Sequence, residues 1–92
     1  MKLMLTTKSI PYRQGHVEVS NVHDGCVNVE MWRVDPDVDA KLSLGGRLDY
    51  QGDEVTDNVE LELSIAEAEQ LAEGLLAAAR IAADKLRRCT PV

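Results

Sequence analysis

The sequence has no phenylalanine, and Tyr12, Trp32 and Tyr50 are its only aromatic residues. A core in this chain must therefore be built from aliphatic side chains. Leucine, isoleucine and valine supply them, with 11, 3 and 10 copies. That supply is too large for a disordered chain, so we expect a packed core. The lack of aromatic stacking platforms and of a basic stripe argues against an RNA-recognition sheet.

Cysteine is also scarce. Cys26 and Cys89 are the only two, and no CxxC pair is present, which excludes a zinc ribbon and a thioredoxin-type redox motif. The first eight residues are too short and too polar to contain a signal-peptide apolar region, so we expect a cytoplasmic protein with two free thiols. No stretch approaches the roughly 20 apolar residues of a membrane span, and we expect no membrane association.

Catalytic and metal-binding signatures are missing as well. The sequence contains no GxSxG, no phosphate-binding glycine loop with lysine and no HExxH. His16, His23 and Cys26 lack a fourth ligand at a standard spacing. The acidic segment 35–39 lacks the glycine and the glutamate that a calcium loop needs at its sixth and twelfth positions. We therefore expect a protein without enzymatic activity, catalytic residues, metal or cofactor.

Basic residues are few in the middle of the chain. Residues 35–73 carry twelve acids and two bases, a net charge of −10, whereas residues 1–34 carry +1 and residues 74–92 carry +3. The whole chain has a formal net charge of −6, which argues against direct nucleic-acid binding. Two interpretations stay open: the acids keep a small protein soluble, or they form a negative surface that docks onto a basic partner.

A hairpin around Asp24-Gly25 is the clearest local pattern, because apolar and polar residues alternate on both sides of it. A two-residue turn would set the apolar residues of one strand against the polar residues of the other. A three-residue loop, 23–25, with glycine in the left-handed region pairs Val19 with Val29 and Val17 with Met31. All apolar side chains of the hairpin then share one face, and we predict this register.

The same register has a consequence on the other face of the hairpin. It places His16 opposite Trp32 and Glu18 opposite Glu30. Two carboxylates beside a histidine could act as a general acid/base site or hold a metal ion. The alternative is that water or a nearby base neutralises the pair, the candidate bases being Lys41, Arg33 and Arg47.

Alternating apolar residues predict three further strands, over residues 3–7, 40–50 and 59–63. In the second of these the alternation continues in step across Gly45-Gly46, which favours one bent strand over a tight hairpin. Ser64-Ile65-Ala66-Glu67 then has the spacing of a helix capping box. From Ile65 to about Arg88 only Gly74 interrupts a helix with one apolar stripe, acids near its start and bases near its end.

These elements predict an α+β fold in a single domain, residues 1–92. An antiparallel β-meander of four to five strands is followed by one long C-terminal helix packed on the sheet. The alanine-rich face of the helix permits close approach to the sheet or to a second helix. We therefore also expect a homodimer.

The leading hypothesis is a small non-enzymatic protein-interaction module that docks a basic partner protein through an acidic surface. One alternative is an inhibitor from a phage or mobile element, of the anti-CRISPR or anti-restriction type, whose carboxylates imitate nucleic-acid phosphates. Another is a small-ligand-binding domain with a pocket between sheet and helix or across a dimer interface. The residues predicted to bind the partner are Trp32, Asp53, Glu54, Asp57, Glu60 and Glu62.

Overall fold

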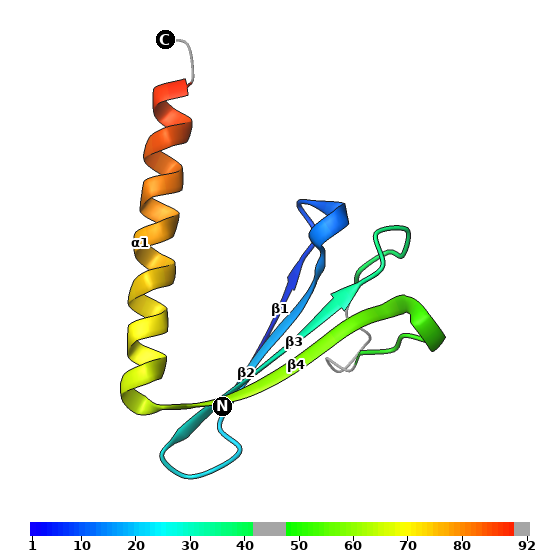
Figure 1. Ribbon diagram of the computed structural model, residues 1–92, viewed down its shortest axis with the longest axis horizontal. Coiled ribbons are helices and arrows are strands. Elements are labelled where there is room, and N and C mark those ends of the chain that lie inside the picture. The colour runs from blue at the N-terminus through cyan, green and yellow to red at the C-terminus, as the bar shows by residue number, and fades with distance from the viewer. Residues whose placement is uncertain (42–47, 90–92) are drawn as a thin grey trace.

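The chain folds as a four-stranded antiparallel sheet followed by one long helix, which confirms the predicted α+β meander (Figure 1). The computed structural model describes residues 1–41 and 48–89. Neighbours along the chain are also neighbours in the sheet, in the order β1-β2-β3-β4. The elements are β1 (Lys2–Thr7), the 3-10 turn η1 (Pro11–Arg13), β2 (Gly15–Ser20), β3 (Cys26–Val34), the 3-10 turn η2 (Gly52–Glu54), β4 (Val55–Ser64) and α1 (Ile65–Cys89).

The predicted hairpin register is confirmed. Val19 pairs with Val29 and Val17 with Met31 across β2 and β3. Gly25 has a φ of 74°, in the left-handed region where glycine is favoured. Because side chains alternate along each strand, this register gathers the apolar residues of the hairpin on one face.

The segment between β3 and β4 differs from the prediction of a strand over residues 40–50. Residues 42–47 lie outside the described part of the chain, and the described residues on either side, 40–41 and 48–50, are not in a strand. The segment instead anchors to the sheet through Tyr50. In addition, β4 begins at Val55, earlier than predicted, so Asp57 lies inside a strand and not in a loop.

The sheet has two chemically different faces. We call the first the polar face; it carries Lys2, Met4, Thr6, His16, Glu18, Ser20, Asn28, Glu30, Trp32, Asn58, Glu60 and Glu62. We call the second the apolar face; its apolar residues are Leu3, Leu5, Val17, Val19, Val27, Val29, Met31, Val59, Leu61 and Leu63.

Burial is uneven on both faces: several polar side chains of the polar face are buried, whereas five of the ten apolar residues of the apolar face are exposed. On the polar face His16 is only 1% exposed, and Ser20 and Asn28 are buried. On the apolar face Leu5 is 56% and Leu61 is 61% exposed. The polar face is covered from both ends by loops, whereas only the first turns of α1 approach the apolar face.

The helix begins as predicted. The Ser64 backbone N–H donates to Glu67 Oε1 at 2.8 Å, and the Glu67 backbone N–H donates to Ser64 Oγ at 3.2 Å. These two bonds form a capping box, which satisfies two backbone donors at the start of the helix.

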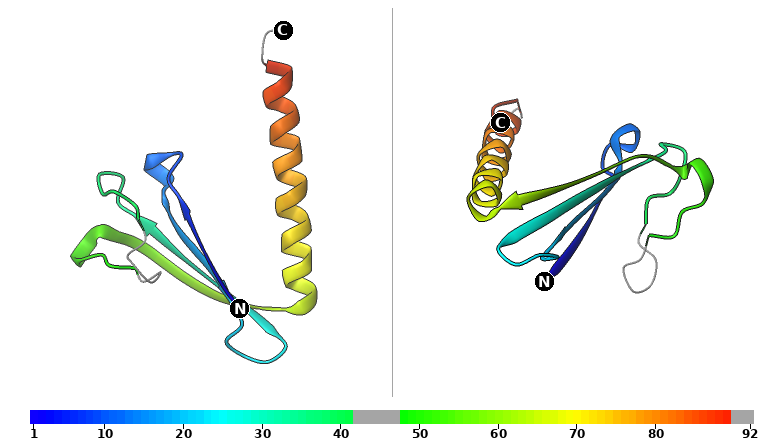
Figure 2. Two further views of the ribbon diagram at one scale, coloured as in Figure 1. Left: turned by 180° about the vertical axis from the view of Figure 1, so that it is seen from behind. Right: turned by 60° about the horizontal axis from the view of Figure 1, so that its bottom comes forward.

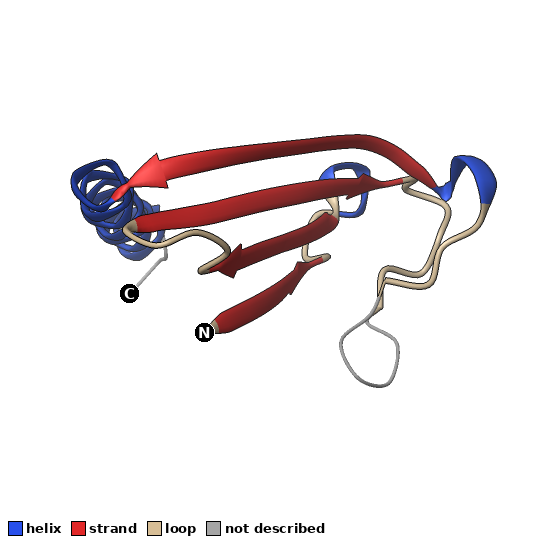
Figure 3. Cartoon of the chain, turned by 90° about the horizontal axis from the view of Figure 1, so that it is seen from below, coloured by secondary structure: helices blue, strands red, loops and turns tan. Residues whose placement is uncertain are grey.

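Helix α1 stands away from the sheet, so that sheet and helix form the two arms of a V (Figures 1 and 2). Figure 3 shows α1 beside one end of the strands and not across their length. The cause is the connection: β4 ends at Ser64 and α1 begins at Ile65. Without a loop the chain cannot reverse over the sheet, because such connections ordinarily take two or more residues. The prediction that the helix packs on the sheet therefore holds only for its first turns, where Ala68 is the one α1 residue that is not exposed.

Within the described residues, no helix is long and apolar enough to cross a membrane.

Candidate functional site

A polar cluster centres on the buried side chain of His16. Its Nδ1 lies 3.0 Å from Thr6 Oγ1, and its Nε2 lies 2.7 Å from the Tyr50 hydroxyl. Burial lowers the pKa of His16 because the charged imidazolium would lose its hydration. Both ring nitrogens of this histidine already have hydroxyl partners. His16 therefore ties Tyr50 and the segment beside it to the polar face.

Gln14 supports the same end of the sheet. Its Nε2 donates to the carbonyl oxygens of Asp35 at 2.7 Å and of Val38 at 2.6 Å. The Val34 backbone N–H donates to the Gln14 carbonyl oxygen at 3.1 Å. Gln14 thus fixes the turn that follows β3. Gln14 could not be identified from the sequence, because no periodicity or motif marks a residue that acts through contacts 21 and 24 positions away.

The predicted pair of opposed carboxylates is present and is part of a longer row. Glu18 lies opposite Glu30, which in turn lies opposite Glu60, so three carboxylates cross β2, β3 and β4 side by side. The base near the row is Lys2, whose Nζ lies 3.8 Å from Glu18 Oε2. Asn58 Nδ2 donates to Glu30 Oε2 at 3.1 Å.

Of the bases predicted to neutralise the pair, Arg33 and Lys41 have other hydrogen-bond partners. Arg33 lies on the opposite face and donates to the Tyr12 carbonyl oxygen at 3.1 Å. Lys41 is held through its backbone by the Tyr50 hydroxyl, and Arg47 is outside the described residues. In the part of the chain that the structure describes, no group of three or more His, Cys, Asp or Glu side chains could hold a metal ion.

The six residues predicted to bind a partner fall into two groups. Trp32, Glu60 and Glu62 share the polar face, and Glu62 Oε1 lies 2.6 Å from His23 Nδ1 in the hairpin loop. Asp57 lies on the apolar face, directly opposite Arg33.

The other two predicted residues lie in η2, at the end of the sheet. Asp53 is exposed there. Glu54 has a structural role: Glu54 Oε1 accepts the Gln51 backbone N–H at 2.6 Å, and its carbonyl oxygen accepts the Asp35 backbone N–H at 2.8 Å. The structure therefore brings together only Trp32, Glu60 and Glu62 on one face.

The V between sheet and helix is lined by apolar side chains on both arms. The residues that line its closed end are Val19, Val27, Val29 and Leu63 of the sheet and Ala68, Leu71, Ala72 and Leu75 of α1. Further along the helix, Leu76, Ile81 and Leu86 are more than half exposed. Fifteen of the 25 residues of α1 are apolar. A helix with apolar residues around so much of its circumference is typical of one covered on more than one side.

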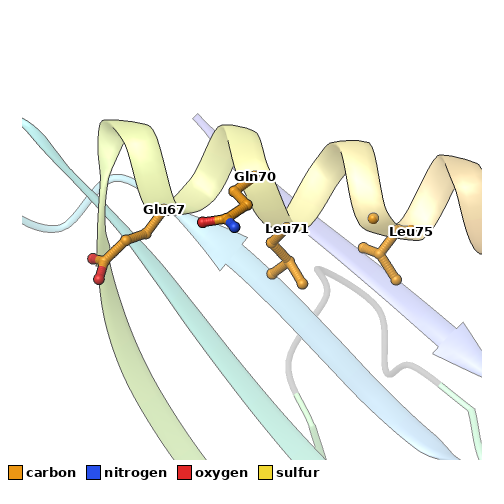
Figure 4. A pocket seen from close by; sticks show the side chains of 5 residues that line it. Glu67, Gln70, Leu71 and Leu75 are labelled. Carbon is orange, nitrogen blue, oxygen red and sulfur yellow. The ribbon is translucent and has the colours of Figure 1, made fainter.

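A hollow on the surface of α1 adds to this bare area (Figure 4). It is lined by Glu67, Gln70, Leu71, Gly74 and Leu75. A Cβ added at Gly74 would meet nothing within 4 Å. The hollow is therefore space that the chain itself leaves unfilled.

The total exposed surface is too large for a compact monomer. The chain exposes 7370 Å², whereas a compact 10.1 kDa protein exposes about 5,300 Å². Its radius of gyration is 15.7 Å, whereas about 12 Å is expected for a domain of this length. The excess is roughly 2,100 Å². The exposed large apolar side chains include residues of the apolar face and of α1.

Comparisons of the chain with protein-family models, with curated proteins and with solved structures give no match. What the protein does must therefore be inferred from its two sheet faces and its exposed helix.

Proposed function

We propose that this chain is a non-enzymatic protein-interaction module that works as a homodimer and presents an acidic surface to a basic partner protein. The observation that carries the proposal is the exposure of apolar residues on the sheet and the helix. The polar face is covered at both ends, whereas five of the ten apolar residues on the apolar face, and every apolar residue of α1 except Ala68, are exposed. Large contiguous apolar surfaces on a soluble protein are typical of interfaces.

The size of the bare surface fits a second copy of the same chain. Two chains that each bury the excess area would bury about 4,200 Å² together, which is in the range of obligate homodimers. An interface with two-fold symmetry uses the same patch on both subunits, so it requires no other protein.

Dimerisation through the V leaves the polar faces of both sheets outward. Each face presents the row of Glu18, Glu30 and Glu60, with Glu62 and Trp32 beside it. Two chains carry a formal net charge of −12, since each carries −6. A negative surface of this kind speeds association with a basic partner and depends on ionic strength.

Self-association is tested by the concentration dependence of thermal unfolding. If folding is coupled to dimerisation, the midpoint rises with protein concentration by mass action. A midpoint that stays constant between 1 and 100 μM would contradict the homodimer.

Docking on the acidic face is tested by partner capture at low and at high salt with the double variant Glu60→Gln/Glu62→Gln. The matched control is Asp37→Asn/Asp39→Asn, which removes the same charge from the exposed turn after β3. We expect the first variant and high salt to abolish capture, and the control to retain it. Equal capture by both variants would contradict docking on this face.

The row of carboxylates also favours a second candidate, an inhibitor that imitates nucleic acid. Neighbouring strands are about 4.8 Å apart, so Glu18, Glu30 and Glu60 form a short line of regularly spaced negative charges. The partner of such an inhibitor is a nucleic-acid-binding protein. Excess duplex DNA should then displace a captured partner, and retention of the partner in its presence would contradict this candidate.

A further inference from the structure

Charge along α1 is segregated. Its first three turns carry Glu67, Glu69 and Glu73 without a base, and its second half carries Arg80, Lys85, Arg87 and Arg88 with Asp84 as the single acid. Two such helices side by side in parallel would place like charges together. In antiparallel orientation the acidic start of each helix lies beside the basic end of the other.

The spacing of these charges is matched to the geometry of a helix. Glu67 and Lys85 are 18 residues apart, which is five full turns at 3.6 residues per turn, so they lie on one line along α1. Glu69 and Arg87 are also 18 residues apart and lie on a second line. Between these two lines runs the apolar stripe that faces the V, formed by Ala68, Leu71, Ala72, Leu75, Ala79, Ala82 and Leu86.

Both pairs also fit a single register. In a two-fold antiparallel pair of helices, the line on one edge of the stripe faces the same line of the other helix. The midpoint between Glu67 and Lys85 is residue 76, and the midpoint between Glu69 and Arg87 is residue 78. Both midpoints lie one residue from residue 77, the middle of α1. One alignment about the middle of the helix therefore brings together opposite charges at four places.

The same alignment sets large side chains against small ones. Leu71 comes opposite Ala82, and Ala68 comes opposite Leu86, because each pair is nearly symmetric about the middle of the helix. Leucines opposite alanines allow two helix backbones to approach closely without voids.

We infer that a second copy of this chain fills the V, with the two α1 helices antiparallel and with Glu67 and Glu69 beside Lys85 and Arg87 of the partner subunit. The inference rests on the proposed homodimer and names its arrangement. Each helix then covers the apolar face of the other chain as well as the other helix. That arrangement explains why α1 is apolar around so much of its circumference and why one chain covers only part of its own apolar face.

The ion pairs are tested with the variants Glu69→Lys and Arg87→Glu, because Glu67 is already engaged in the capping box. Arg87 also pairs with Asp84 of its own helix, and Arg87→Glu loses that contact as well. Each variant creates two like-charge contacts in an antiparallel dimer, and we expect the dissociation constant to rise about tenfold. An equimolar mixture of the two variants restores opposite charges between the subunits at all these places, so heterodimers should form in preference to either homodimer. The control Arg88→Glu changes a charge on the side of α1 opposite the apolar stripe. It should leave the affinity of the homodimer unchanged.

The helix orientation is tested with single-cysteine chains. In the antiparallel register two Cys89 side chains lie roughly 36 Å apart along the helices, since each is twelve residues from the middle. The variant Cys26→Ser, which keeps only Cys89, should form no disulfide-linked dimer under diamide. The variant Cys26→Ser/Cys89→Ser/Ala78→Cys should form one rapidly, because position 78 lies next to the centre of the pair.

The outcomes separate this arrangement from the homodimer itself. Rapid cross-linking at position 78 together with none at Cys89 supports the antiparallel helices. Cross-linking through Cys89, cross-linking at neither position, or unchanged affinity in Glu69→Lys overturns them and leaves the homodimer in place. A monomeric wild-type protein in sedimentation velocity would overturn both.

Discussion

Leu61 lies directly opposite Val29 in the ladder between β4 and β3, and yet 61% of Leu61 is exposed. In most antiparallel sheets an apolar pair of this kind lies beneath a helix or a second sheet. Here the helix leaves the sheet immediately after β4, so its first turns reach Val29 but leave Leu61 exposed. A single chain therefore does not complete its own second layer.

We predict that Leu61→Lys dissociates the proposed homodimer. Leu61 is exposed in one chain, so the substitution costs little in the fold of that chain but places a charge inside the proposed interface. We expect the dissociation constant to rise at least a hundredfold, measured by sedimentation velocity. The control is Glu60→Lys, which lies next in the chain and on the opposite face. If both variants dimerise like the wild type, the apolar face is not the interface.

Two glycine substitutions should have opposite effects on stability. Gly74→Ala should raise the free energy of unfolding by about 1 kcal/mol, because alanine is the better helix former and its Cβ meets no other atom. Gly25→Ala should lower it by about 1 kcal/mol or more, because the φ of 74° is strained for any residue with a Cβ. Urea unfolding followed by the fluorescence of Trp32 measures both. A stabilising Gly25→Ala would show that the hairpin loop has another conformation.

The substitution Gly15→Ala should weaken the pairing of β2 with β3. A Cβ at this position would lie only 2.0 Å from the Trp32 carbonyl oxygen, so the two strands would have to separate locally. We expect a lower urea midpoint and faster hydrogen exchange of the amides at this end of the hairpin. Exchange as slow as in the wild type would contradict the close approach of the two strands.

The substitution Ser64→Ala should remove the helix cap and cost about 1 kcal/mol of stability. The Ser64 backbone N–H, and then its hydroxyl, also lower the pKa of Glu67 by bonding its carboxylate form. The contribution of Glu67 to the stability of the fold is therefore present above its ordinary pKa of 4.5, and it is lost as the pH falls below that value. Helicity measured by circular dichroism should decrease at low pH in the wild type, and less so in Ser64→Ala.

Stability should also fall on mild acidification because of His16. Burial lowers its pKa in the folded protein, so the unfolded chain takes up a proton first as the pH falls below 6.5. The free energy of unfolding should therefore be level above neutrality and decline from pH 6.5 downward. The variant His16→Gln should lose this decline, and His23→Gln should keep it. A decline of equal size in all three proteins would show that His16 does not titrate in this way.

The elements that follow from local pattern could be predicted from the sequence. The register of Val19 with Val29 follows from alternation around Asp24-Gly25, and the start of α1 follows from Ser64 and Glu67. Both depend on residues close together in the chain, where the geometry of strand and helix allows few alternatives.

The contacts that span the chain could not be predicted in this way. Tyr50 reaches His16 across 34 residues, and the periodicity around Tyr50 suggested a strand. Alternation shows that the faces of a sheet differ, but it does not show what covers each face. The sequence analysis therefore grouped Asp57 with Glu60 and Glu62, although the strand places Asp57 on the opposite face.

The most direct test of the central proposal is the mass of the protein in solution, measured by light scattering at 10 to 100 μM. Coverage of the V by a second copy predicts a particle of twice the 10.1 kDa of one chain. A particle of 10.1 kDa at the highest concentration would contradict it.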